Sequence, residues 1–114
     1  MSQFANREEL RAAIKKFTGQ DAVAKQEIIT MYGDIRLWNV QNVTDMHGMF
    51  YNCYDFNSDL SKWNVGNVIN MSCMFHNCHV FNSDISLWDV GNVQNIPGMF
   101  AKCYVFNSDL SKWN

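Results

Sequence analysis

Apolar residues recur along most of the chain at a constant interval of 25 residues. The interval holds for large aromatic side chains and for small ones, and residues 56–64 are identical to residues 106–114. The recurring positions include Trp38, Trp63, Trp88 and Trp113, then Phe50, Phe75 and Phe100, and also Cys53, Cys78 and Cys103. A period of this length is typical of proteins built from stacked units that bury their faces against each other. We therefore expect these columns to point inward.

A short helix is predicted in each unit. In the first unit, Met46, Met49, Phe50 and Cys53 follow the spacing of one apolar helix face. Asp45 precedes this stripe, and its side chain can accept hydrogen bonds from the amides of a first helical turn. The equivalent capping positions are Asn70 and Asn95. The pattern predicts helices of about two turns that begin near residues 46, 71 and 96.

A short strand is predicted after each helix. The segments 60–63 and 85–88 contain β-favouring residues but are too brief to be stable alone. Stacking of the units would align Ile35, Leu60, Ile85 and Leu110 in a parallel ladder. The sequence thus predicts an α/β repeat solenoid, a stack of 25-residue coils with one short parallel strand and one short helix each.

Polar residues also recur with this period. Asn42, Asn67 and Asn92 form one such column, and we expect them to bond backbone groups at the bends. We expect a similar structural role for the aspartates before each strand, which are Asp34, Asp59, Asp84 and Asp109. A cation site is the alternative at that corner, although each coil supplies one carboxylate there.

The N-terminal residues differ from the repeats. Residues 6–17 predict an amphipathic helix that is capped by Asn6 and ended by Gly19. A second helix is predicted from Asp21 to Tyr32, with Ala24, Ile28 and Met31 inward and Gly33 as its terminator. We interpret residues 1–33 as an N-terminal helical cap, and residues 34–114 as three full repeats plus a fourth strand. The opposite end of the stack is predicted to be open.

Composition and charge exclude several classes of function. The chain has 114 residues, a net charge of −2 and no cluster of basic residues, so we expect no nucleic-acid partner. The polar N-terminus and the lack of a long apolar segment predict no signal peptide and no membrane insertion. We expect a cytoplasmic location or one within a virion. The regular spacing of the cysteines indicates repetition, and we expect them to be reduced.

The repeat pattern closely resembles the BspA-like leucine-rich repeat family. It reads Asp-Ile/Leu-Ser-x-Trp-Asn/Asp-Val-x-Asn-Val-x-x-Met-x-x-Met-Phe-x-x-Cys-x-x-Phe-Asn-Ser, and the resemblance covers residues 34–114. It implies a leucine-rich-repeat-like, right-handed solenoid of the kind found in bacterial surface proteins, mycoplasma lipoproteins and giant-virus proteins. The resemblance brings no catalytic residues with it.

Chemistry-bearing residues do not form a recognisable catalytic or metal site in the sequence. Cys73, His76, Cys78 and His79 lie close together, but their spacing is not that of a zinc site. Three of them occupy positions that vary between coils, whereas Cys78 belongs to the inward column. The chain also lacks a nucleophile elbow and a phosphate-binding glycine loop. We therefore predict no enzyme activity, no cofactor and no metal.

Positions that vary between coils are the candidates for binding a protein partner, because they are not needed for packing. One set falls in the predicted strands and comprises Arg36, Leu37, Lys62, Leu87 and Lys112. The other lies near the ends of the predicted helices and comprises Tyr51, Tyr54, His76, His79 and Tyr104. The leading hypothesis is a protein–protein interaction module. The alternative is a structural component that associates with itself through residues 104–114 at the open end.

Overall fold

The computed structural model describes residues 3–113 and begins with two helices, α1 (Arg7–Thr18) and α2 (Ala22–Tyr32). Asn6 caps α1, since its Oδ1 atom accepts a hydrogen bond of 3.0 Å from the amide of Glu9. The buried face of α1 carries Leu10, Ala13 and Ile14. This helix agrees with the one that the pattern of residues 6–17 predicts.

Helix α2 also begins and ends where its capping residues predict. The Asp21 carboxylate accepts hydrogen bonds from the first amides of the helix, and Gly33 ends it with a positive φ of 80°. Ile28 is buried, but Met31 is 67% exposed, so the expectation that Met31 points inward is wrong. The reason is that Tyr32 continues the inward stripe from Ile28 and packs against Phe4 at 4.5 Å between ring centroids.

The repeats do not contain the secondary structure that their pattern predicts. Within residues 3–113 the structure has no β-strand, and its only helical element after α2 is the 3₁₀ turn η1 (Ile35–Leu37). Isolated parallel bridges join Asp45 to Asn70 and Asn70 to Asn95. The prediction of an α/β repeat solenoid, a leucine-rich-repeat-like, right-handed stack with a strand and a helix in each coil, is therefore wrong. The molecule is a small compact body of about 39 × 31 × 19 Å.

Left-handed residues explain why the predicted helices are absent. Gly48 and Asn52 have φ values of 59° and 63°, and a helix requires right-handed residues throughout. Each lies at the third position of a tight turn: the Met49 amide donates to the carbonyl of Met46, and the Cys53 amide to that of Phe50. Successive turns therefore place the apolar residues inward with the spacing of a helix face.

Turns also replace the predicted strands. After η1, the amides of Trp63, Trp88 and Trp113 each donate to the carbonyl three residues earlier. The bond from Trp63 to Leu60 is 3.0 Å long. The amide of Leu60 bonds the hydroxyl of Ser83 at 2.9 Å and does not join a strand ladder. The side chain of Asp59 tightens this turn by accepting from the amide of Ser61. A segment folded in this way cannot pair as an extended strand.

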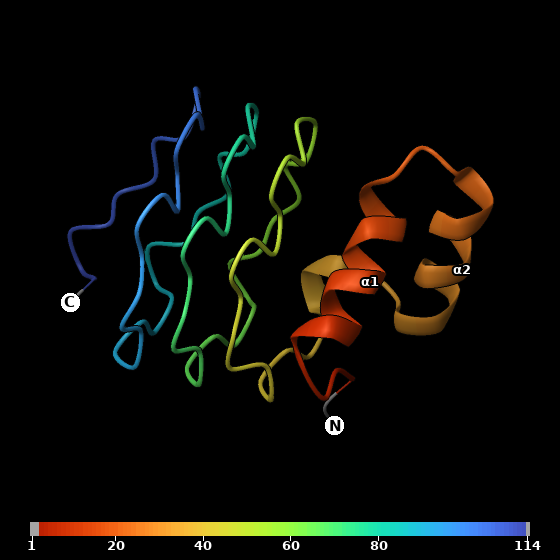
Figure 1. The fold of residues 1–114 in the computed structure, drawn as a ribbon, viewed down its shortest axis with the longest axis horizontal. Coiled ribbons are helices and arrows are strands. Elements are labelled where there is room, and N and C mark those ends of the chain that lie inside the picture. The colour runs from red at the N-terminus through yellow and green to blue at the C-terminus, as the bar shows by residue number, and fades with distance from the viewer. Residues whose placement is uncertain (1–2, 114) are drawn as a thin grey trace.

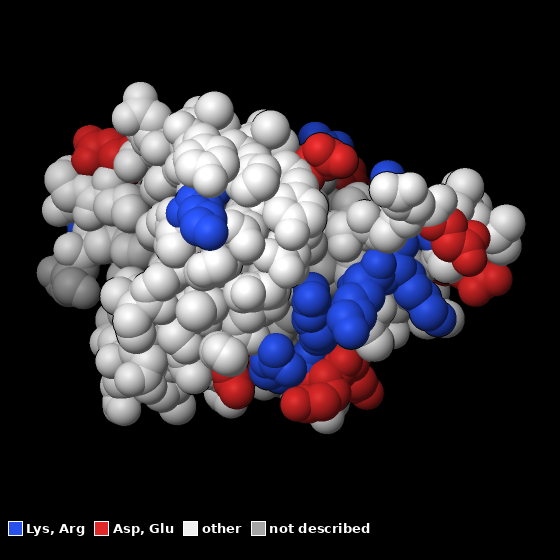
Figure 2. Space-filling model, turned by 45° about the horizontal axis from the view of Figure 1, so that its top comes forward, with Lys and Arg blue, Asp and Glu red and all other residues white. Residues whose placement is uncertain are grey.

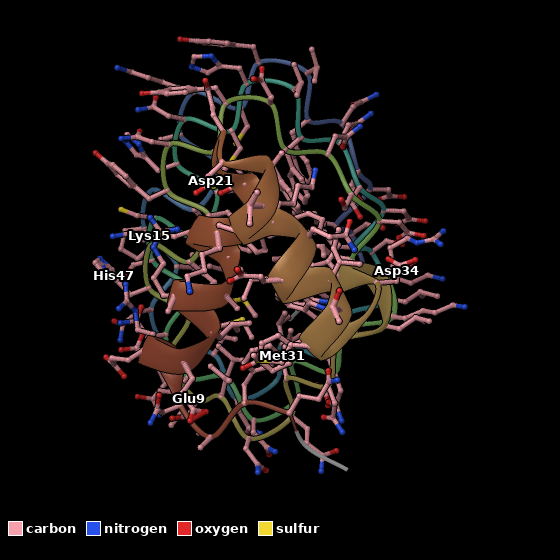
Figure 3. All side chains as sticks on the ribbon, turned by 90° about the vertical axis from the view of Figure 1, so that its right-hand side faces the viewer. Glu9, Lys15, Asp21, Met31, Asp34 and His47 are labelled. Carbon is pink, nitrogen blue, oxygen red and sulfur yellow. The ribbon has the colours of Figure 1, made fainter. Side chains whose placement is uncertain are left out.

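The 25-residue units lie side by side, each as an irregular chain path, and the helices stand at one end (Figure 1). Figure 3 views the molecule from that end, where α1 and α2 lie across the units behind them. The apolar columns form one core that continues into α1 through Leu10 and Ile14. Trp63 is 3% exposed, and the rings of Phe50 and Phe75 stack with their centroids 5.3 Å apart. Burial decreases toward the last unit, where Phe100 and Trp113 are only partly buried.

Candidate interaction surfaces

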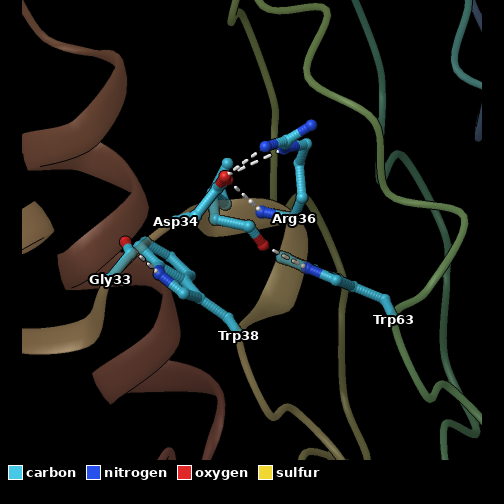
Figure 4. A network of polar contacts seen from close by, with 6 residues as sticks. Gly33, Asp34, Arg36, Trp38 and Trp63 are labelled. Carbon is cyan, nitrogen blue, oxygen red and sulfur yellow. Dashed lines mark hydrogen bonds and ion pairs between the residues drawn. The ribbon is translucent and has the colours of Figure 1, made fainter.

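The first set of candidate partner residues lies on the turns that follow the repeated aspartates. All five are exposed, and they are Arg36, Leu37, Lys62, Leu87 and Lys112. Leu37 and Leu87 are 65% and 78% exposed. Arg36 is held by Asp34, with Nη2 and Nε at 2.6 and 2.9 Å from the same carboxylate oxygen (Figure 4). These side chains project from four successive turns, with Arg36 and Leu37 on the same one, and leucine and lysine alternate between units at the second position.

The repeated aspartates act as turn caps. Asp34, Asp59, Asp84 and Asp109 each accept a hydrogen bond from the amide two residues later, at 2.9–3.1 Å. Hydrogen bonds from Arg36 lower the pKa of Asp34, and those from Ser61 lower the pKa of Asp59. Within residues 3–113, no three His, Cys, Asp or Glu side chains gather in a way that could hold a metal ion. Each of these carboxylates is therefore hydrogen-bonded to the backbone of its own turn.

The second set of candidate residues forms two aromatic groups, each with ring contacts between units. The rings of Tyr51 and His76 stack with centroids 4.8 Å apart and planes 13° apart. His79 lies between Tyr54 and Tyr104, with centroid distances of 4.9 and 4.8 Å. We name these five residues the aromatic strip. Tyr51, Tyr54 and Tyr104 are exposed and both histidines are half-buried, so the strip presents flat rings to solvent across three units.

The cysteines serve packing and hydrogen bonding. The thiols of Cys78 and Cys103 donate to the carbonyls of Phe50 and Phe75, at 2.9 and 2.8 Å. Burial raises the pKa of the Cys78 thiol, so it stays protonated at neutral pH. All four cysteines are free. Cys73 contacts the carbonyl of Pro97 at 3.9 Å, whereas Cys78 faces the core, which separates the two thiols that the sequence brings close.

A hollow lies between the helices and the first unit, beside Phe17, Lys25 and Asp55. Cys53 lines it, and the Cys53 Sγ atom lies 3.7 Å from the hydroxyl of Thr18. Burial raises the pKa of Cys53, which disfavours the thiolate that a nucleophile needs. Lys25 lies over the ring of Phe17, 4.9 Å from its centroid. Cys53 is therefore a buried structural thiol and not an activated nucleophile.

The asparagine column joins the units through backbone carbonyls. Asn67 Nδ2 donates to the carbonyl of Gln41 at 2.8 Å, and Asn92 Nδ2 donates to that of Gly66 at 2.7 Å. The first member of the column, Asn42, is exposed. These bonds connect each unit to the one before it, which satisfies carbonyls at the bends.

Two contacts between α1 and the first unit are not predicted by the sequence pattern. Arg7 of α1 donates to the carbonyl of His47 through Nη2 and Nε at 2.7 and 2.9 Å, and Arg11 donates to the carbonyl of Met49 at 2.8 Å. The spacing of the two arginines by one helical turn was the available signal. Figure 2 shows positive side chains gathered toward the helical end, while the units carry few charges on that face.

Residues 20–114 match a protein family described as "Mycoplasma protein of unknown function, DUF285". Because the match covers most of the chain, the chain belongs to this family. No curated protein and no solved structure matches it. Among residues 3–113, neither helix has the length and apolar character needed to cross a membrane.

Proposed function

We propose that the chain is a non-catalytic protein–protein interaction module that binds its partner through the aromatic strip. The supporting observation is the ring contact between units, which orders exposed side chains from three successive units on one surface. Contact with the His79 ring restricts the Tyr54 and Tyr104 side chains before binding, so less conformational entropy is lost when a partner contacts them. Tyrosine supplies apolar area and a hydroxyl together, which suits protein interfaces.

The other candidate set fits this role less well. Leu37 and Leu87 are exposed, but Lys62 occupies the same position in the unit between them. Arg36 is already paired with Asp34, and a partner would have to replace that hydrogen bond. These residues therefore offer isolated contacts, whereas Tyr54 and Tyr104 of the aromatic strip both contact His79 across three units.

A structural role is the second candidate, and the last unit favours it. The rings of Phe100, Phe106 and Trp113 are only partly buried there, so association through residues 104–113 would bury more apolar surface. The resemblance to BspA-like repeat proteins of bacterial surfaces and giant viruses fits this reading. The four free cysteines fit a reducing compartment, such as the cytoplasm, for either role.

Affinity capture with paired variants tests the proposal. Immobilised wild-type chain, a Tyr54→Ser/Tyr104→Ser variant and a Leu37→Ser/Leu87→Ser variant are exposed to the same lysate of the native source. We expect one protein that the wild type and the leucine variant recover and the tyrosine variant loses. The captured protein is then purified and its Kd measured, with an increase of at least tenfold expected for the tyrosine variant. Equal binding by all three variants would refute a role for the aromatic strip.

Light scattering distinguishes the second candidate. A binding module is expected to remain monomeric when it is purified, at concentrations where an assembly component forms oligomers. If oligomers form and a Phe106→Ser substitution dissolves them, the structural role is favoured over the module.

A further inference from the structure

The hollow between the helices and the first unit has the size of a small-molecule site. Its volume is about 430 Å³, and one wall comes from residues 17–20 together with Lys25 of α2. The other wall comes from residues 52–58 of the first unit. Cavities of roughly 300–1,000 Å³ that combine apolar surface with a few polar groups are typical of sites for small ligands.

Asparagines of adjacent units bond each other on the side of the units that lines the hollow. Asn77 Nδ2 donates to Asn52 Oδ1 at 2.7 Å, and the amide of Asn82 donates to Asn57 Oδ1 at 2.7 Å. The third unit repeats the second bond, from the amide of Asn107 to Asn82 Oδ1 at 2.8 Å. In each of these bonds the donor lies on one unit and the acceptor on the unit before it.

The first unit has the helices before it in place of another unit. Its equivalent donors are the Nδ2 group of Asn52 and the backbone amide of Asn57, and both residues line the hollow. Within residues 3–113, neither donor has a hydrogen-bond acceptor. The repeat therefore provides two donors at the hollow, and hydrogen bonds of this kind are strongest when the acceptor is an anionic oxygen.

Two opposite charges also line the hollow. The Nζ atom of Lys25 lies 4.9 Å from the centroid of the Phe17 ring, and both residues are part of one wall. Asp55 belongs to the opposite wall. In the part of the chain that the structure describes, neither charge takes part in an ion pair. The C-terminal end of α1 contributes Thr18 to the lining, and a helix C-terminus favours a positive charge.

We propose that the hollow binds a free α-amino acid with an apolar side chain. Lys25, the Nδ2 group of Asn52 and the amide of Asn57 are the donors for its carboxylate. Asp55 is the acceptor for its ammonium group. An inorganic anion fits less well, because the carboxylate of Asp55 would repel it. The lining side chains carry one charge of each sign, which matches a zwitterion.

The hollow also has apolar surface for the side chain of the ligand. Phe17 is only partly buried, so part of its ring can be covered by an apolar group. The volume suits a single small molecule, in contrast to the protein partner proposed for the aromatic strip. The inference therefore goes beyond the proposed function, although Tyr54 contributes to both surfaces.

NMR titration of the full chain with L-leucine tests the proposal. We expect saturable shifts of the Asn57 amide and of the Asn52 side-chain amide. The Asn107 amide, which is bonded to Asn82 in the third unit, is the internal control and should not move. L-leucinamide lacks the carboxylate and isocaproate lacks the ammonium group. Each of these analogues should bind about tenfold more weakly than leucine.

Three charge variants assign the two ends of the ligand. Lys25→Gln should raise the Kd for leucine about tenfold and largely remove its advantage over leucinamide, because the carboxylate has lost its cationic partner. Asp55→Asn should largely remove the advantage of leucine over isocaproate for the corresponding reason. Lys62→Gln is the matched control, since it removes an exposed cation outside the hollow and should leave the Kd unchanged.

Three results would overturn the proposal. One is the absence of shifts at Asn52 and Asn57 with leucine at up to roughly 10 mM. Another is binding of isocaproate as tightly as leucine, which would identify a simple anion site. The third is equal weakening by Lys25→Gln and Lys62→Gln, because it would show that the overall charge of the chain attracts the ligand.

Discussion

The indole N–H of Trp63 donates a hydrogen bond of 2.7 Å to the backbone carbonyl of Ile35, 28 residues earlier in the chain. Figure 4 shows this bond beside the turn that contains Asp34 and Arg36. The bond recurs with the repeat, from Trp88 to Leu60 at 2.9 Å. Each buried indole therefore fills the core and also satisfies a carbonyl of the preceding unit, so the tryptophan column connects neighbouring units in two ways.

Replacement of Trp63 by alanine should strongly destabilise the chain. The substitution leaves a large cavity, which costs about 3–5 kcal/mol, and it removes the partner of the Ile35 carbonyl. Urea unfolding followed by circular dichroism measures the loss. Trp113→Ala is the matched control, because Trp113 makes the equivalent bond to Ile85 but is only partly buried. A loss below about 1 kcal/mol for Trp63→Ala would contradict the packing role.

Cys73→Gly should stabilise the chain by about 0.5–1 kcal/mol. Cys73 has a φ of 55°, which is costly for a residue with a side chain, and glycine occupies this position in the other two units. The gain is limited because glycine loses more backbone entropy on folding. Denaturant midpoints of the variant and the wild type give the difference.

Gly48→Ala is the reciprocal test at the same position of the first unit. A Cβ atom there has room, since its nearest neighbours would be Tyr51 Cβ at 3.7 Å and Arg7 Nη2 at 3.9 Å. The φ of 59° therefore supplies the cost, and we expect a loss of about 1 kcal/mol. If both substitutions change stability in the same direction, backbone strain is not the cause.

The period and the inward columns could be predicted from the sequence, but the backbone path between them could not. Met46, Met49, Phe50 and Cys53 have the spacing of a helix face, and successive turns place side chains inward with that same spacing. The informative signal was glycine or asparagine at the third position of the turns, such as Gly48 and Asn52, which favours left-handed backbone. The capped helices were predictable because Asn6, Asp21 and Gly33 act on adjacent residues.

The contacts at the candidate surfaces also divide into those that the repeat predicts and those that it does not. The repeat register brings Tyr51 beside His76 once the units are stacked, so the members of the aromatic strip can be chosen from the sequence. The contact from Arg11 to the carbonyl of Met49 could not, because it joins a helix to a turn 38 residues away. Repetition predicts neighbours within the repeats, and it contains no information about how a different element packs against them.

Arg11→Met should destabilise the chain by about 1–2 kcal/mol, although methionine keeps most of the apolar stem. The guanidinium donates to the Met49 carbonyl in a partly buried setting, and hydrogen bonds to charged groups contribute about this much. Thermal or urea unfolding measures the change. Lys16→Met on the exposed face of α1 is the matched control and should alter stability by less than about 0.5 kcal/mol. Equal effects of the two substitutions would argue against a stabilising bond from Arg11 to the Met49 carbonyl.

The buried thiol of Cys78 should make the stability of the chain fall at alkaline pH. Burial raises the pKa of Cys78 in the folded chain, so above the ordinary thiol pKa of about 8.5 the unfolded chain loses a proton that the folded chain retains. Folding then weakens as pH rises, by at most about 1.4 kcal/mol per pH unit from this thiol. Urea unfolding of the wild type and of Cys78→Ala between pH 7.5 and roughly 10 isolates its part, because tyrosines and lysines titrate in both proteins. The free-energy difference between the two should shrink above about pH 8.5, and a constant difference across this range would contradict a protonated Cys78 in the core.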